Sequence, residues 1–514
     1  MRPEILEARR AMPDYMFLLE SRLSPEQRAV LVRVQELAVA VGYNLYLTGG
    51  TVRDLITGAT LRDLDFTVEG NPSKLARELE KGGAKVLVED EHRREIELLF
   101  SGDCLGSISA ARDDYYARPG TRPEYHWSSI MEDLRRRDFS LNAIAVSLNP
   151  ASRGLLLDPA NGLSDIERGE IRALSIHSFT NQPARLLRAV RYAARMGFHL
   201  EQRTQDWFNL AMERDLHHSI SPDDAGDELR AVAAEERPAT ILKAWEAAGI
   251  LESLHANLAK RHPGYEAIAR LSKAREDLFS AGLRPRLANP MLAAVLARLK
   301  DREQSALLSK LGFRVAETEA ALGLEDKALA AQKELLGRKC KEALDAFKFL
   351  EKMPLEQMAF LMAESRKSQA VSKIRAYLQK WRPLRSGLPA IIAELEGIGM
   401  AHGPKFNLVI EQCFGAQLAG RGKTPEERIK ILRKLSGIKE PPKKKEEKKE
   451  EKKKPPKAPE KAAPAPGKPG GIGARVEARK EAAKVAAQAP AAAAKAPAGK
   501  KKSKPAKKAK KRKK

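Results

Sequence analysis

The sequence predicts an α+β fold, in which a small mixed α/β head precedes an all-helical neck and body and a disordered basic C-terminal tail. Strand-like and helical segments alternate up to about Leu148. Beyond Ser178, apolar residues recur every three or four positions, which is the period of a helix. From about residue 440 the chain is a low-complexity mixture of Lys, Ala, Pro and Glu, which cannot bury enough apolar surface to offset its chain entropy.

These changes of pattern divide the 514 residues into five segments. We expect an N-terminal extension, a head, a helical neck, a helical body and a tail at 1–23, 24–153, 154–253, 254–439 and 440–514. Residues 441–514 hold 27 Lys or Arg and 7 Asp or Glu, so 20 of the 25 net positive charges lie there. The rest of the chain is only mildly basic, and the total charge does not by itself indicate a nucleic-acid partner.

The first helix of the head has a clear start signal. Ser24 can act as the N-cap, Pro25 occupies the first helical position, and Gln27 can complete a capping box. We expect this helix to end near Ala40, just before the first strand.

The next segment joins a strand to a short helix through two glycines. Leu45–Leu47 form an apolar strand, Gly49 and Gly50 form a turn, and Thr51–Ile56 can be helical, with Gly58 placed to end the helix. Adjacent glycines allow backbone N–H groups and a helix N-terminus to approach an anion closely. This arrangement suits a triphosphate.

Two carboxylates follow on the returning strand. Asp63 and Asp65 are two residues apart, so both side chains project from one face of that strand. Neighbouring carboxylates repel each other unless a cation neutralises them, and Mg²⁺ prefers such oxygen ligands. A phosphate-binding turn beside a metal-binding pair indicates a nucleotidyl-transfer site.

The remainder of the head is expected to contain three more strands and a helix. The strands are predicted at 85–90, 94–100 and 105–111. The helix is expected to begin at Arg136-Arg137-Asp138 and to turn three apolar side chains inward, namely Phe139, Leu141 and Ile144.

A row of arginines marks the neck. Its members recur at three or four residues along an expected helix and therefore share one side of it, at positions Arg185, Arg188, Arg191 and Arg195. The opposite side is apolar, and no acidic residue lies close to the row in sequence. This pattern favours a ligand-facing row over a solvated one. From about Leu254 to Leu435 the pattern is helical throughout, interrupted by prolines.

Cysteine content and hydropathy indicate the compartment. Cys104, Cys340 and Cys413 are far apart and form no CxxC pair, so we expect neither a zinc finger nor a disulfide framework. No uninterrupted apolar run approaches the length that crosses a membrane. We therefore expect a cytoplasmic protein without a membrane partner.

Three motifs resemble one family. GGTVRD followed by DLD is similar to the GGxVRD and DxD signature of the tRNA nucleotidyltransferase and bacterial poly(A) polymerase family. RRDFSLNA resembles the family's RRDFTxNA motif, and NQPARLLRAVRY resembles its base-reading EDPxRxLRAxRF helix. The resemblance spans about residues 24–255 and implies a nucleotidyltransferase head followed by a neck that binds RNA and the base.

The resemblance also implies the functional residues. The catalytic and metal-binding residues would be Asp63 and Asp65, holding Mg²⁺. The nucleotide-binding residues would be Gly49, Gly50, Arg53, Arg137, Asp138, Gln182, Arg185 and Arg188. Within this set, Arg137 and Asp138 would hold the ribose and phosphate, and Gln182 with Arg185 would read the base.

The chain departs from the family pattern in three places. Ser107 stands where the family commonly has a third carboxylate. Asn181 and Gln182 replace the acidic pair that precedes the base-reading arginine. Asp224 stands where a segment that usually reads Glu-Arg has its arginine. An amide oxygen at residue 182 can still accept a hydrogen bond from the amine of C or A, but without a full charge.

The resemblance implies a template-independent RNA nucleotidyltransferase that adds CMP, AMP or both from CTP and ATP to tRNA 3′ ends. The helical body would hold the tRNA by its shape, phosphates and 2′-hydroxyls. Two alternatives remain open at this point: a poly(A) polymerase, and an RNA-binding protein with a degenerate active site. The sequence leaves open whether CC, A or CCA is added, because the geometry of the pocket decides which base is accepted.

Overall fold

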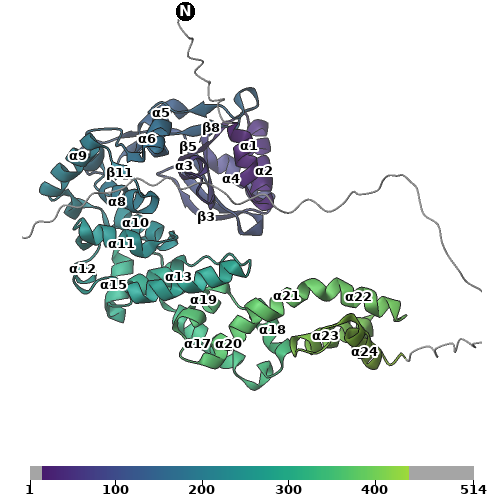
Figure 1. Ribbon diagram of the computed structural model, residues 1–514. Coiled ribbons are helices and arrows are strands. Elements are labelled where there is room, and N and C mark those ends of the chain that lie inside the picture. The colour runs from purple at the N-terminus through teal and green to yellow at the C-terminus, as the bar shows by residue number, and fades with distance from the viewer. Residues whose placement is uncertain (1–13, 439–514) are drawn as a thin grey trace, which may run out of the picture. The chain divides into compact units, whose positions relative to one another are not determined.

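The computed structural model describes residues 14–438, from just before α1 (Tyr15–Arg22) to just after α24 (Pro425–Ser436) (Figure 1). The expected tail at 440–514 and residues 1–13 of the expected extension lie outside the described residues. Strands occupy the first part of the described chain and helices the remainder, which confirms the predicted fold class.

The head is built on a seven-stranded mixed sheet with the strand order β3-β4-β5-β2-β1-β8-β9. β1 pairs antiparallel with β2 and β8, whereas β2 pairs parallel with β5. The strands of this sheet are β1 (Asn44–Thr48), β2 (Asp63–Glu69), β3 (Lys85–Asp90), β4 (Glu95–Leu99), β5 (Leu105–Ala110), β8 (Ala145–Ser147) and β9 (Leu156–Leu157).

Two helices cover one face of this sheet. α2 (Pro25–Val41) packs against β1, and α4 (Pro72–Lys81) packs against β3, β4 and β5. Leu64, Phe66 and Val68 of β2 are fully buried in the core on that side. Because side chains alternate along a strand, Asp63 and Asp65 project from the opposite face.

Several predicted boundaries are confirmed. Ser24 caps α2 and forms the expected capping box with Gln27. Gly58 ends the short helix α3 (Gly49–Thr57) with a left-handed φ of 80°, as expected, although this helix begins at Gly49 and not after the glycine pair. The strands expected at 85–90, 94–100 and 105–111 correspond to β3, β4 and β5.

The prediction of a helix from Arg136 onward is wrong. Helix α5 (Ile130–Arg135) ends there, and Phe139 is extended with φ −131° and ψ 150°. The Asp138 carboxylate accepts the Phe139 N–H at 2.7 Å, and Phe139 bridges to Ala173, so the backbone bonds of a helix are not made. Phe139, Leu141 and Ile144 are nevertheless fully buried, as expected.

The neck and body consist almost entirely of helices. Residues 254–438 contain no strand, as predicted, and two-residue strands β10 (Glu170–Ile171) and β11 (His199–Leu200) pair in the neck. A hairpin of β6 (Arg112–Tyr115) and β7 (Glu124–Trp127) precedes them. The helices from α6 to α23 are α6 (Gly162–Arg168), α7 (Ser178–Asn181), α8 (Arg185–Met196), α9 (Gln202–Glu213), α10 (Pro222–Ala234), α11 (Pro238–Ala247), α12 (Ala256–Arg261), α13 (Tyr265–Ser280), α14 (Ala288–Leu296), α15 (Asp301–Lys310), α16 (Val315–Leu322), α17 (Leu324–Leu335), α18 (Ala343–Lys352), α19 (Leu355–Glu364), α20 (Ser368–Ala376), α21 (Arg382–Leu384), α22 (Leu388–Gly397) and α23 (Pro404–Leu418).

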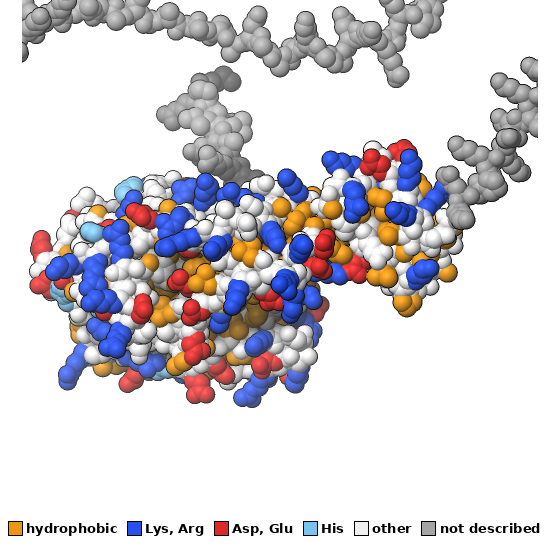
Figure 2. All heavy atoms as spheres, turned by 90° about the horizontal axis from the view of Figure 1, so that it is seen from below, with side chains coloured by type: hydrophobic (Ala, Val, Ile, Leu, Met, Phe, Trp, Pro, Cys, Tyr) orange, Lys and Arg blue, Asp and Glu red, His pale blue; other side chains and the backbone are white. Residues whose placement is uncertain are grey.

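Charged side chains of both signs are scattered over the face seen in Figure 2, with Asp and Glu lying among more numerous Lys and Arg. This mixture agrees with the small net charge that the sequence assigns to the chain before residue 441. None of the helices in the described range is both long enough and apolar enough to cross a membrane. Cys104, Cys340 and Cys413 are buried free thiols.

Candidate active site

The open face of the head sheet forms one wall of a cleft of about 1140 Å³. β2, β5 and the start of α3 line it from the head, and α8 and α10 line it from the neck. All ten residues that the sequence identified as functional lie along this cleft, namely Gly49, Gly50, Arg53, Asp63, Asp65, Arg137, Asp138, Gln182, Arg185 and Arg188. Residues from two separate stretches of the chain are therefore brought to a single site.

The two carboxylates lie together on β2. Asp65 pairs in register with Ser107 of the parallel strand β5, and the Ser107 hydroxyl donates to Asp65 Oδ1 at 3.1 Å. Ser107 thus lies beside Asp65, at the position where the family resemblance implies a third acid. A hydroxyl there supplies a neutral hydrogen bond instead of a negative charge.

Thr51 fixes the pair against the neighbouring helix. Its hydroxyl donates to the backbone carbonyl of Asp63 at 3.1 Å and accepts the N–H of Asp65 at 2.8 Å. A single side chain at the start of α3 therefore holds the strand that presents both acids. The sequence predicted only that Thr51 lies in a helix. Its position directly after the glycine pair is the one feature of the sequence that points to a role at the site.

The glycine pair lets the start of α3 approach this strand. Gly49 has a φ of 60°, and a Cβ at Gly50 would lie 3.1 Å from Asp65 Oδ2. Helix α3 has no side-chain cap, so its first N–H groups face the cleft unpaired by a capping group. Unpaired N–H groups at a helix N-terminus bind anions such as phosphate.

The two acids fit a divalent cation. Neither forms a salt bridge with any residue between 14 and 438, although many arginines line the same cleft. Desolvation in the cleft and the charge on Asp65 raise the pKa of Asp63 to about 6. Adjacent carboxylates that lack a cationic partner match the oxygen ligands preferred by Mg²⁺ and similar hard ions.

This raised pKa predicts a stability effect. The ordinary pKa of an Asp carboxyl is 3.8, and the raised value means that the folded protein binds this proton more tightly than the unfolded chain does. Above about pH 6 the carboxylate is charged in both states, and in the metal-free folded protein that charge lowers the free energy of unfolding. In the presence of EDTA, Asp63→Asn should therefore raise the Tm at pH 7–8. The difference should disappear below pH 3.8, where the carboxyl is protonated in both states. Thermal unfolding across this pH range checks the prediction, and a lower Tm for Asp63→Asn at pH 7–8 would contradict it.

The second motif forms a network around Asp133, Arg137 and Asp138. Arg137 donates to the buried Asp133 carboxylate at 2.7 and 3.1 Å, and its Nη1 lies 3.2 Å from the Cβ position of Gly49. Asp138 accepts from Asn142 at 2.9 Å and from Arg188 at 3.0 Å. Burial opposes the charge on Asp138, but Arg188 and Arg185 outweigh it and lower its pKa to about 2.

The arginine row has acidic partners that its sequence neighbourhood lacks. Glu228 of α10, 2% exposed, accepts from Arg188 at 2.6 Å and from Arg191 at 2.9 Å. Arg195 bonds to Asp54 of α3 at 2.7 Å and lies 3.3 Å from Glu235. The row therefore joins the head to α10 through buried ion pairs, with Arg188 also facing the cleft.

The amide pair Asn181 and Gln182 lies at the end of α7, just before α8 begins at Arg185. Gln182 Oε1 accepts from Arg185 Nε at 3.1 Å, and Ser178 accepts from Arg185 Nη1 at 2.9 Å. Burial lowers the pKa of Arg185, and the Asp138 charge opposes that shift. Arg185 and Gln182 thus form one hydrogen-bonded unit at the wall of the cleft.

Arg53 lines the cleft, and its guanidinium also bonds to other residues of the protein. Its side chain is buried, its Nε donates to Asp54 at 2.9 Å, and its Nη1 donates to Asn142 at 2.9 Å. The guanidinium also stacks over the ring of Tyr192, 4.9 Å from its centroid. It therefore ties α3 to the second motif and to α8.

The charge reversal at Asp224 is compensated by a distant arginine. Arg93, between β3 and β4, lies 3.5 Å from Asp224 and 2.9 Å from Asp227. These contacts join the connection between β3 and β4 to the N-terminal half of α10. The sequence analysis noted the reversal but not Arg93, because the two positions are more than a hundred residues apart.

Sequence comparison places the head among known proteins. Residues 45–172 match the family described as the poly A polymerase head domain. The chain is 28% identical over 433 residues to an A-adding tRNA nucleotidyltransferase of Halalkalibacterium halodurans, covering 82% of this chain and 96% of that protein. It is 33% identical over 293 residues to a CC-adding tRNA nucleotidyltransferase of Deinococcus radiodurans, covering 54% of this chain and 76% of that protein. An A-adding enzyme of Aquifex aeolicus is 29% identical over 343 residues, which span 66% of this chain but 41% of that protein.

Proposed function

The chain belongs to the tRNA nucleotidyltransferase family, and on this premise we propose that it transfers CMP, AMP or both from CTP and ATP to the 3′ end of tRNA. One observation carries the proposal. Asp63 and Asp65 lie side by side without a salt bridge to any residue between 14 and 438, next to the uncapped N-terminus of α3, and in a cleft that also holds the arginines of the neck. That arrangement combines a metal-binding pair with a phosphate-binding helix end.

Enzymes of this family use a divalent metal ion, and we propose Mg²⁺ held by Asp63 and Asp65. When bound, such an ion stabilises the charge that develops on the attacking and leaving oxygens during phosphoryl transfer. Asp63 and Asp65 would orient the ion, and Ser107 would fix the Asp65 carboxylate through its 3.1 Å hydrogen bond.

The remaining residues would bind the nucleotide. The N–H groups of Gly49 and Gly50 would receive the triphosphate, because no side chain caps this helix start. Arg137, held by Asp133 and half-buried beside Gly49, would contact the sugar and phosphate together with Asp138. Arg53 and Arg188 would act mainly by positioning, since both already bond to acids or amides of the protein.

Gln182 and Arg185 are proposed to read the base. The Gln182 oxygen can accept from the exocyclic amine of C or A, and an Arg185 N–H can donate to the adjacent ring nitrogen. U and G present the opposite order of donor and acceptor at these atoms. Arg185 is held toward Gln182 at 3.1 Å, so the pair is already oriented before a nucleotide enters.

The neutral amide at residue 182 predicts leaky base selection. A carboxylate accepts a hydrogen bond about twice as strongly as an amide oxygen. We therefore expect Gln182→Asp to raise the ratio of CTP or ATP use to UTP use by roughly tenfold, which corresponds to about 1.4 kcal/mol. Single-turnover incorporation of each nucleotide measures this ratio, with Asn181→Asp as the control for added charge next to the site. An unchanged ratio in Gln182→Asp would remove this residue from base reading.

The activity is tested with labelled CTP and ATP on tRNAs that end before CCA, after C, or after CC. Incorporation that stops after two C residues, after one A, or at CCA identifies the products. Extension of an unrelated RNA into a long A tract would instead indicate a poly(A) polymerase. Absence of any transfer with Mg²⁺ present would favour an RNA-binding protein with a degenerate site, for which the serine at residue 107 is the relevant departure.

We also propose a function for each segment of the chain. We assign nucleotidyl transfer to the head at 24–153, base and RNA binding to the neck at 154–253, and tRNA binding by shape to the body at 254–439. Free, buried thiols at all three cysteines fit the reducing cytoplasm, where we place the enzyme.

A further inference from the structure

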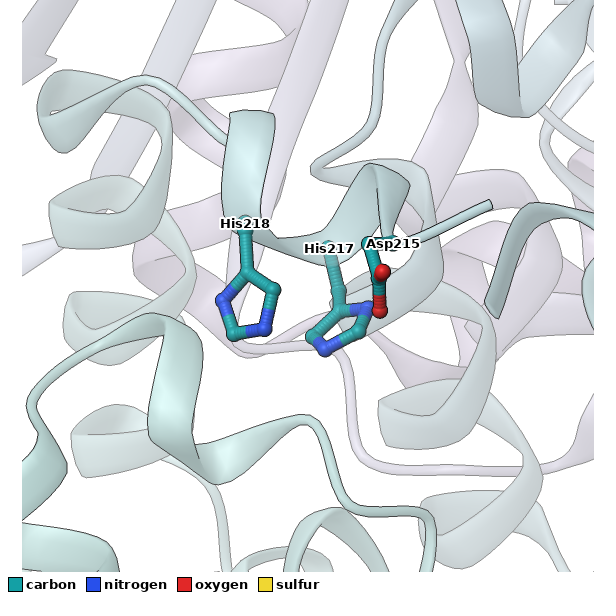
Figure 3. A group of neighbouring side chains, drawn as sticks. All are labelled: Asp215, His217 and His218. Carbon is teal, nitrogen blue, oxygen red and sulfur yellow. The ribbon is translucent and has the colours of Figure 1, made fainter. Parts of the chain in front are cut away.

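The turn between α9 and α10 gathers three metal-ligating side chains. Asp215, His217 and His218 lie on or just before a 3₁₀ turn, Leu216–Ser219, which follows the last residue of α9. One potential ligand atom from each residue lies within 4.8 Å of the other two. Figure 3 shows the His217 ring and the Asp215 carboxylate side by side, with the His218 ring next to them.

His217 has an unsatisfied nitrogen in this cluster. Its side chain is only 8% exposed, and its Nδ1 is buried without a hydrogen-bond partner anywhere in residues 14–438. A buried polar atom without a partner destabilises the folded protein. Neither imidazole forms a side-chain hydrogen bond with the described protein, although the two rings are in contact, tilted by 40° with centroids 4.0 Å apart. This buried nitrogen is therefore free to bind a metal ion.

We propose that Asp215, His217 and His218 bind a borderline divalent transition-metal ion such as Zn²⁺. Two imidazole nitrogens and one carboxylate oxygen are the donor set that Zn²⁺ accepts, whereas Mg²⁺ prefers oxygen ligands alone. This site is therefore chemically distinct from the carboxylate pair of the cleft. It is also independent of the proposed transfer reaction.

The geometry requires only small side-chain movement. Ligand atoms of a tetrahedral zinc site are about 3.4 Å apart, given metal–ligand distances near 2.0–2.1 Å. Asp215 and His218 are exposed and can move toward His217, which the core holds in place. Burial and the neighbouring His218 lower the pKa of His217, which favours the neutral ring that binds metal ions.

The three side chains leave one position of a four-coordinate site open. A water molecule would take that position, as it does in zinc sites with three protein ligands.

The place of the site suggests a structural role. Ser219 and Ser221, which directly follow the cluster, line the cleft, and α10 begins at Pro222. That helix carries Glu228, the partner of two arginines of α8. An ion bound at this turn would fix the entry into α10 and thereby stabilise the neck wall of the cleft.

Metal binding is tested on the full-length, tag-free chain after chelator treatment. Zn²⁺ titration by calorimetry should show one ion per chain in a variant that carries both Asp63→Asn and Asp65→Asn, which removes the carboxylate pair of the cleft. In the same background, His218→Ala should weaken Zn²⁺ binding by at least about 100-fold, because a direct ligand matters more than the outer partners that cost 10–100-fold. His218 is exposed, so this substitution leaves the core intact.

Two further measurements complete the test. His402→Ala removes another exposed histidine, which lies 2.9 Å from Glu396, and should leave Zn²⁺ binding unchanged. Co²⁺ in place of Zn²⁺ should give visible d–d absorption of a four-coordinate site, and His217→Gln or His218→Ala should abolish it. Absence of stoichiometric Zn²⁺ binding, or binding that His218→Ala leaves intact, would overturn the proposal.

Discussion

Replacing Asp65 with alanine should nearly abolish nucleotide transfer while leaving the fold intact. Asp65 is one of two carboxylates on β2 that face the cleft, and it has no salt-bridge partner within residues 14–438 that its loss would leave unpaired. Loss of a metal-binding carboxylate removes several kcal/mol of transition-state stabilisation. We expect kcat to fall by roughly a thousandfold, equivalent to about 4 kcal/mol. Single-turnover AMP or CMP transfer with Mg²⁺ measures the effect.

The matched control for this variant is Ser107→Ala. It removes the hydrogen bond to Asp65 Oδ1 but keeps the carboxylate. A neutral hydrogen bond contributes about 0.5–1.5 kcal/mol, so the rate should fall by about tenfold at most. Thermal unfolding should give similar Tm values for the wild type and both variants. Transfer by Asp65→Ala at a rate comparable to the wild type would show that β2 does not carry the metal-binding pair.

Glu228→Gln should strongly destabilise the protein. Glu228 is 2% exposed and pairs with both Arg188 and Arg191. Burial alone would raise the pKa of Glu228, but the two guanidinium groups lower it below its ordinary value. Without the carboxylate, buried positive charge is left uncompensated, which costs about 3–5 kcal/mol. Chemical denaturation at pH 7 measures the loss of unfolding free energy.

The adjacent residue provides the control. Asp227 also pairs with two arginines, Arg93 at 2.9 Å and Arg230 at 3.0 Å, but its side chain is 41% exposed. Exposed ion pairs contribute about 0–1 kcal/mol, so Asp227→Asn should have little effect. The two variants differ mainly in burial. If Glu228→Gln cost no more than Asp227→Asn, the arginine row would not depend on this acid for its position.

Short-range signals allowed the sequence to predict much of the head. The capping box at Ser24, the glycine at residue 58 and the alternation at Asp63 and Asp65 each depend on contacts within a few residues. Such contacts form in the same way in almost any tertiary setting, and so a local pattern is sufficient to predict them. The resemblance then supplied the roles of residues whose local pattern is ambiguous, such as Arg137.

The segment from Arg136 to Ala145 shows where local reasoning fails. Its apolar spacing fits a helix, and the three residues expected to face inward are buried. Yet Phe139 bridges to Ala173, residues Ser140–Asn142 form a single 3₁₀ turn, and Ala145 begins β8 opposite Thr48, so no α-helix forms. The same apolar side chains reach the core from this irregular chain, because burial depends on the neighbours and not on the period alone.

The sequence by itself determined the two acids, the glycine pair and the helical nature of the neck, because each rests on neighbouring residues. Only the tertiary structure decided what the arginines do. Arg188, Arg191 and Arg195 appear unpaired along the chain, but folding brings Glu228 and Asp54 to them from about 40 and 140 residues away. A buried charge must be paired, and its partner can come from any part of the chain that the fold places within a few ångströms.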